Sequence, residues 1–153
     1  MRQKVIQLLN EARSRELTAV NQYMIHHYEL EDRDFGKLAS KIKEIAIAEM
    51  KHAEKLAERI LFLKGEPTSE PDATPKKGQE ITEILATDMA LEVQAVKMYN
   101  EAAVTCSSER DQKSKDLFEE LLSDEEKHLH FFENIKNHVE KLGENYLATL
   151  TGK

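Results

Sequence analysis

The sequence has almost no cysteine: Cys106 is the only one among 153 residues. A single cysteine excludes internal disulfides, and it also excludes zinc or iron–sulfur sites held by several thiolates. Any bound metal must therefore use oxygen and nitrogen ligands. The lack of disulfides is typical of a reducing compartment, so we expect the protein to be cytoplasmic.

Long apolar runs and an excess of basic charge are also missing. The first residues, MRQKVIQLLNEARSRE, carry charges where a signal peptide needs an apolar stretch, and no run approaches the length of a membrane span. Lys and Arg number 22 against 29 Asp and Glu, giving a net charge of −7, the wrong sign for binding phosphate backbones. We expect neither a membrane nor a nucleic-acid partner.

Residues that interrupt helices are scarce and unevenly placed. The chain has five glycines and three prolines, and all three prolines lie within residues 65–80. This distribution predicts long helices on both sides of one mid-chain connection. We expect a single domain over residues 1–153, with helices at about 2–32, 37–64, 79–107 and 110–142 and a short helix at 144–151.

The connection at residues 65–80 is long enough to run the length of a helix. Its 16 residues span about 50 Å when extended, whereas a helix of 28 residues is about 42 Å long. The two helices before it and the two after it can therefore form two antiparallel hairpins joined by a long crossover. The sequence predicts an all-α fold, an up-down four-helix bundle of the ferritin-like kind with a short C-terminal fifth helix.

Each long predicted helix has an apolar face that an ionisable residue interrupts near mid-length. A buried carboxylate without a partner is costly, so four that converge at one level require cations. Two divalent ions would balance their charge, and carboxylate with imidazole suits iron, manganese or zinc. The candidate metal ligands are Glu16, Glu49, His52, Glu92, Glu125 and His128.

The spacing of these candidates reveals an internal repeat. Glu16 and Glu49 are 33 residues apart, as are Glu92 and Glu125, and the two pairs are offset by 76 residues. The motif Glu-x-x-His occurs at the second glutamate of each pair, and Tyr23 recurs as a tyrosine 76 residues later. Two related hairpins facing each other would build one dimetal site with approximate two-fold symmetry.

Several segments resemble bacterioferritin over essentially the whole chain: ELTAVNQY, EMKHAEKLAERILFLKGEP, DMALE, SDEEKH and GENYL. The resemblance implies a hollow shell of 24 subunits, arranged as 12 dimers, that oxidises Fe(II) with O2 or H2O2 and stores a ferric mineral. It also implies two iron ions per subunit, each held by carboxylate and imidazole. The implied roles are Glu49 and Glu125 as bridges, Glu16 with His52 on one iron, Glu92 with His128 on the other, and Tyr23 beside the site.

The resemblance also implies a haem, of type b or a related porphyrin, at the subunit dimer interface. Met50 matches the methionine that each of two subunits supplies as an axial ligand. Haem would help return electrons when iron is released, for which a ferredoxin-type protein is the implied reductant. Some members of the family carry an auxiliary iron site on the inner surface. The matching positions here are Glu44 and Ala48, and because Ala48 cannot bind metal, at least one ligand of that site is missing.

Other polar residues are expected to be structural. His27 shares a helix face with Glu16 but lies about 16 Å away along the axis, whereas His130 and His138 fall outside the inward stripe and are expected at the surface. Asp88 lies one turn before Glu92, where a supporting polar role is expected rather than ligation.

Two other functions remain open from the residues. The same ligands would serve a non-storing di-iron or di-manganese oxidase or peroxidase similar to rubrerythrin, although the sequence has no Cys-x-x-Cys pair for an attached electron-transfer domain. A helical scaffold would instead need its inward carboxylates protonated or paired with basic residues. We expect no Lys or Arg at the inward level of the four glutamates, which disfavours the scaffold.

Overall fold

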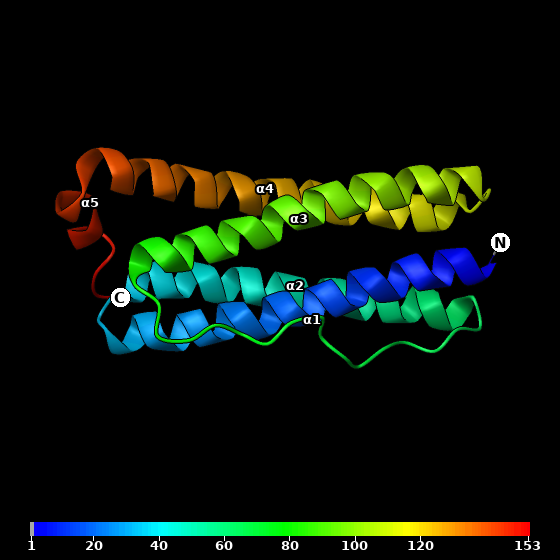
Figure 1. Ribbon diagram of the computed structural model, residues 1–153, viewed down its shortest axis with the longest axis horizontal. Helices are drawn as coiled ribbons and strands as arrows, with labels where there is room; N and C mark the ends of the chain where they lie inside the picture. The colour runs from blue at the N-terminus through cyan, green and yellow to red at the C-terminus, as the bar shows by residue number, and fades with distance from the viewer. Residues whose placement is uncertain (1) are drawn as a thin grey trace.

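The computed structural model describes residues 2–153, which form a bundle of four long helices and one short helix, the predicted ferritin-like fold. Helices α1 and α2 form one antiparallel hairpin and α3 and α4 form the other (Figure 1). The connection from α2 to α3 runs along the bundle, and the chain termini lie at opposite ends. The helices are α1 Arg2–Asp32, α2 Gly36–Phe62, α3 Ile81–Ser108, α4 Gln112–Leu142 and α5 Glu144–Ala148.

Local backbone geometry places the ends of α2 and α3 slightly inside the predicted ranges. Helix α2 ends at Phe62 rather than at 64, because Lys64 adopts a left-handed conformation with φ of 69°. Helix α3 begins at Ile81 rather than at 79. The side chains of Glu80 and Glu83 form a reciprocal capping box there, which fixes the first turn.

The ends of α4 and α5 follow the same logic. Arg110 has φ of 60°, so it cannot begin α4, and Asp111 caps the helix by accepting a hydrogen bond from Ser114 N at 3.0 Å. Helix α5 ends at Ala148 rather than at 151. Leu150 lies beyond α5 and is buried in the core cluster that contains the first residues of α2.

The crossover is fastened to α1 by side chains that replace missing backbone partners. Thr18 Oγ1 accepts from Asp72 N at 2.8 Å. The Gln22 amide both donates to Lys76 O at 2.9 Å and accepts from Lys76 N at 2.8 Å. These bonds satisfy polar backbone groups of a segment without regular structure, so the crossover is a fixed cover over the outer face of α1.

The hydrophobic core consists of two clusters separated by a polar layer. One cluster lies towards α5 and includes Tyr23, whose ring centroid is 5.8 Å from that of Phe132. The other lies towards the N-terminus and includes Tyr99, 5.7 Å from Phe118. All four long helices contribute to both clusters, so each half of the bundle is closed by apolar packing.

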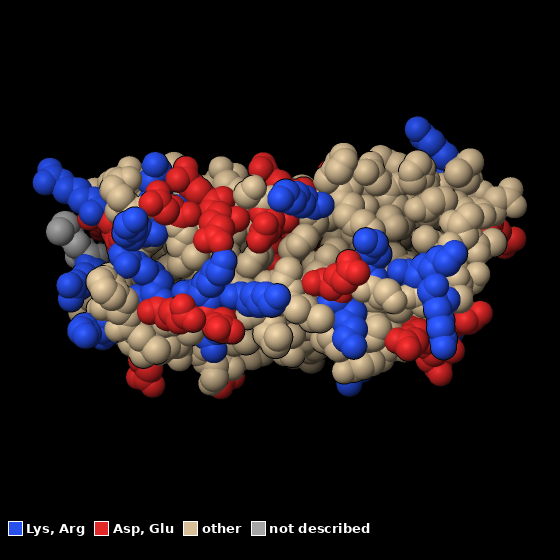
Figure 2. Space-filling view, turned by 180° about the vertical axis from the view of Figure 1, so that it is seen from behind, with Lys and Arg blue, Asp and Glu red and all other residues tan. Residues whose placement is uncertain are grey.

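The outer surface is strongly charged. Figure 2, which views the molecule from behind Figure 1, shows acidic and basic side chains interspersed over much of this face, with a group of acidic ones left of the centre and few charged side chains at the upper right. None of the helices within residues 2–153 combines the length and apolar character needed to cross a bilayer.

Candidate metal centre

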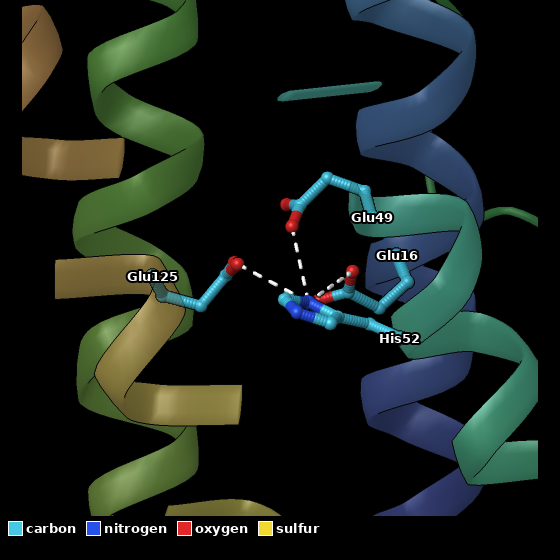
Figure 3. Close-up of side chains that lie close together, drawn as sticks. All are labelled: Glu16, Glu49, His52 and Glu125. Carbon is cyan, nitrogen blue, oxygen red and sulfur yellow. Dashed lines mark ion pairs between the residues drawn. The ribbon is translucent and has the colours of Figure 1, made fainter. Parts of the chain in front are cut away.

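The polar layer brings together all six side chains predicted as metal ligands. They form two groups whose ligand atoms lie within 4.8 Å of one another, and Glu49 and Glu125 belong to both. The four glutamates are fully buried, and Figure 3 shows three of them converging on His52. The remaining members are Glu16 and His52 in one group and Glu92 and His128 in the other.

Both imidazoles present the same ring atom to the carboxylates. His52 Nδ1 lies 3.1 Å from Glu49 Oε1 and 3.4 Å from Glu125 Oε1. His128 Nδ1 lies 3.5 and 3.3 Å from the same two oxygens. The rings stack with centroids 6.3 Å apart, so the two halves of the centre are related by approximate two-fold symmetry, as the repeat predicts.

Each of the six side chains contributes one buried atom without a hydrogen-bond partner. Buried polar atoms normally have hydrogen-bond partners. Six buried oxygen and nitrogen atoms that lack such partners and face one another are the arrangement expected of metal ligands. Carboxylate oxygens and imidazole nitrogens form a donor set suited to iron, manganese or zinc. The atoms are Glu16 Oε2, Glu49 Oε1, His52 Nδ1, Glu92 Oε2, Glu125 Oε1 and His128 Nδ1.

Two buried tyrosines each donate a hydrogen bond to a glutamate of the opposite hairpin, in each case a glutamate that belongs to only one of the two ligand groups. Tyr23 OH donates to Glu92 Oε1 at 2.5 Å, and Tyr99 OH donates to Glu16 Oε1. Tyr23 was expected beside the site. The sequence identifies Tyr99 only as the repeat partner of Tyr23, although their 76-residue offset is itself a signal that the two tyrosines have the same role. Burial, reinforced by nearby carboxylates, raises the pKa of both phenols well above the ordinary value.

The two histidines differ in their outer contacts. His52 Nε2 donates to Asp124 Oδ2 at 2.8 Å, and the Asp124 side chain is 44% exposed. This bond keeps a proton on Nε2, so that Nδ1 is the ring atom that can bind a metal ion at the centre once its own proton has left. The repeat places Ala48 at the position equivalent to Asp124, so this position offers no carboxylate to His128.

Arg15 shows that the expectation of no Lys or Arg at the level of the four glutamates is wrong. The four glutamates do have a basic residue at their level: the Arg15 side chain is fully buried among them. Its Nη1 lies 2.6 Å from both Glu49 Oε2 and Glu125 Oε2 and 2.9 Å from Glu16 Oε1. The apolar stripe of α1 does not include Arg15, because adjacent helix positions are rotated by about 100°, but a long side chain can turn back towards a neighbouring face.

The charges in this layer shift the pKa values of both imidazoles. Burial alone would lower the pKa of His52, but contacts with Glu125, Glu16 and Glu49 outweigh it and raise the pKa well above 6.5. The same balance raises the pKa of His128 to about 12. Metal binding must displace these protons, so it releases protons and strengthens as pH rises.

The carboxylates respond to Arg15. Burial disfavours the charged form of Glu49, yet the adjacent Arg15 guanidinium holds the pKa of this carboxyl well below its ordinary value. Burial dominates at Glu125 and raises its pKa. Arg15 thus favours the ionised form of Glu49, whereas burial favours the protonated form of Glu125.

Polar residues outside the ligand set have structural partners. His27 Nδ1 donates to Ala39 O at 2.7 Å, and His26, which the sequence did not single out, donates from Nδ1 to Asp88 Oδ1 at 2.7 Å. Burial raises the pKa of Asp88 to about 6. His130 and His138 are exposed, in line with the expectation.

The two remaining positions noted in the sequence lie on α2. The Met50 side chain is on the outside of the bundle, with the residue 53% exposed. Glu44 also faces outward and pairs with Lys41 at 3.5 Å. Neither residue belongs to the buried ligand groups.

Comparison with known proteins identifies the family. The sequence pattern of the Ferritin-like domain matches residues 6–142. The bacterioferritin of Desulfovibrio desulfuricans is 42% identical over 149 residues, which cover 97% of this chain and 83% of that protein. The chain belongs to the bacterioferritin family. The bacterioferritin of Brucella melitensis is also 42% identical, over 96% of this chain and 91% of that protein.

A solved bacterioferritin structure matches the fold closely. The X-ray structure of the Desulfovibrio desulfuricans bacterioferritin superposes with a TM-score of 0.97 and 41% identity, covering 99% of this chain and 89% of that one. That structure describes the diiron site of its protein in different catalytic states. The predictions of a ferritin-like fold and of a bacterioferritin relationship are thereby confirmed.

Proposed function

We propose that this protein is an iron-storage ferroxidase, which oxidises Fe(II) at the buried centre and retains the ferric product inside a shell built from its own copies. The observation that carries the proposal is the set of six buried, unpartnered donor atoms, arranged in two groups that share two carboxylates. Membership of the bacterioferritin family supports it.

The geometry suggests a role for each ligand residue. Glu49 and Glu125 belong to both groups, so they are placed to bridge two substrate ions. Carboxylates are hard ligands that favour the ferric state, and two ions held close together can deliver two electrons in one event. Two Fe(II) ions reduce O2, with two protons, to H2O2, or reduce H2O2, with two protons, to two water molecules.

Haem binding is a separate part of the proposal and depends on Met50. A thioether is a suitable axial ligand for haem iron, and the exposed position of Met50 on α2, outside the metal centre, leaves it free to face a second subunit. One methionine per chain supplies half of such a site. We propose haem at a dimer interface, a 24-subunit assembly in the cytoplasm, and release of iron by a ferredoxin-type reductant.

The experiment that tests storage is an aerobic Fe(II) titration of purified protein, followed by size-exclusion chromatography with iron and protein measured in each fraction. Ferric iron far in excess of two per chain, travelling with a very large particle, is the expected result. If iron stops at two per chain on a small oligomer, the storage function is wrong, and the alternative of a closed di-iron or di-manganese oxidase or peroxidase takes its place.

Variants test whether the centre performs the oxidation. Glu16→Ala and His128→Ala should lower the initial oxidation rate by more than about tenfold, because each removes one ligand. His130→Ala is the matched control, since His130 is an exposed histidine on the same helix as His128. Equal initial rates in all variants would rule out this centre as the site of oxidation.

A further inference from the structure

The buried guanidinium of Arg15 breaks the internal symmetry of the metal centre. The repeat places Leu91 at the equivalent position in the second hairpin, 76 residues later. Arg15 Nη2 donates to the backbone oxygen of that same residue at 2.9 Å. The centre therefore contains one guanidinium where exact two-fold symmetry would require two or none.

Arg15 binds the oxygens that a bridging carboxylate needs. At both Glu49 and Glu125, Oε2 lies 2.6 Å from Arg15 Nη1, whereas Oε1 has no hydrogen-bond partner. A carboxylate that bridges two metal ions with one oxygen on each ion uses both of its oxygens. With Arg15 in this position, each shared carboxylate offers one oxygen freely and the other only in competition with a charge-assisted hydrogen bond.

Charge leads to the same conclusion. When the glutamates are ionised and the imidazoles neutral, as metal binding requires, the ligands and the guanidinium carry a formal charge of −3, which one divalent ion reduces to −1 and two convert to +1. An uncompensated charge is unfavourable in a buried layer. The positive charge of Arg15 thus already neutralises part of the carboxylate charge that a second metal ion would otherwise neutralise.

We propose that Arg15 is a built-in competitor of the second metal ion. The centre binds the first divalent ion readily and binds the second only when the guanidinium leaves the Glu49 and Glu125 oxygens. This inference rests on the proposed dimetal function and adds an order of filling to it. Arg15 acts through the shared carboxylates and is a positioning residue.

Equilibrium titration with Co(II), followed by its visible absorption, tests the order of filling without iron chemistry. The wild-type protein should bind two ions per chain with clearly separated affinities. Arg15→Leu makes positions 15 and 91 identical and should tighten the second binding step by at least about tenfold, with little change in the first. Arg15→Lys, which keeps the charge, should retain the separation.

A stability measurement distinguishes competition from simple structural support. With chelator present, Arg15→Leu and the polar variant Arg15→Gln should unfold at a lower temperature than wild type, because the buried carboxylates lose their guanidinium partner. Saturating Zn(II) should raise the unfolding temperature of both variants, relative to the chelator-treated protein, by more than it raises that of the wild type. Circular dichroism establishes that the helical content is retained, and Arg15→Gln provides the test if Arg15→Leu does not fold.

Two outcomes would overturn the proposal, and they differ from failure of the metal centre itself. An unchanged second affinity for Co(II) in both Arg15→Leu and Arg15→Gln would refute competition while leaving the dimetal site intact. An absence of Co(II) binding in wild type, or full binding by Glu16→Ala, would refute the site and the competition together.

Discussion

The two tyrosines of the centre should contribute unequally to stability, although the repeat makes them equivalent. Tyr23→Phe removes the hydrogen bond to Glu92, whose nearest remaining cationic contact is Arg15 Nη2 at 3.5 Å. Tyr99→Phe removes the bond to Glu16, but the same oxygen keeps Arg15 Nη1 at 2.9 Å. A hydrogen bond to a charged group contributes about 1.5–3 kcal/mol. We therefore expect Tyr23→Phe to destabilise the metal-free protein by about 2–3 kcal/mol and Tyr99→Phe by about 1 kcal/mol.

Urea unfolding of chelator-treated protein, monitored by far-UV circular dichroism, measures the difference. All variants must be compared at one protein concentration, because assembly stabilises the folded chain by mass action. Equal slopes with urea concentration would show that the variants differ in stability and not in the extent of unfolding. The two substitutions are well matched, because each removes one hydroxyl from a buried ring that packs against a phenylalanine.

The ranking of the two variants is the decisive result. Equal losses, or a larger loss for Tyr99→Phe, would mean that the Arg15 contact does not compensate Glu16 as the distances indicate. A loss below about 0.5 kcal/mol in both variants would contradict the assignment of these hydroxyls as donors to buried carboxylates.

Three further predictions concern other parts of the bundle. Gly36→Ala should loosen the C-terminal segment and destabilise by about 1–3 kcal/mol, seen as faster carboxypeptidase digestion, because its Cβ would lie 1.8 Å from Gly152 O. Cys106, with a pKa raised by burial to about 11, should react with iodoacetamide at pH 8 at least about 100-fold more slowly in native than in urea-unfolded protein. The raised pKa of Asp88 means that the folded protein binds its proton more tightly than the unfolded chain does, a contribution present below pH 3.8 and lost as pH rises through about 6. Asp88→Asn should therefore gain about 2–3 kcal/mol relative to wild type between pH 4 and pH 7 in paired urea titrations; a pH-independent difference would contradict the buried acid.

The fold and the ligand set were accessible from the sequence because both depend on periodicity. An apolar stripe with a period near 3.6 residues locates the inward face of a helix, and an ionisable residue on that stripe is conspicuous. Glu16 and Glu92 could be recognised in this way without any structure. The 76-residue repeat then related the two hairpins and predicted their symmetric pairing.

Residues that reach the centre from adjacent positions were not accessible in the same way. Arg15 lies beside the stripe, and its inward direction depends on a side-chain conformation that position alone does not fix. Asp124 reaches His52 from another helix, a contact that depends on how α2 and α4 pack. Sequence periodicity predicts which face of a helix is buried, but it does not predict how long polar side chains cross between faces.

The position of the polar layer between two apolar clusters determines how ions can reach it. Passage from either end of the bundle would cross a core formed by all four long helices, and the crossover covers the outer face of α1. On the side of α2 and α4, Asp124 is 44% exposed and bonded to a ligand, and the His128 side chain is 13% exposed. His128 is the most exposed of the six ligand side chains, so the centre comes nearest to solvent on this side, and an ion that approaches here would meet the Asp124 carboxylate before it reaches His52.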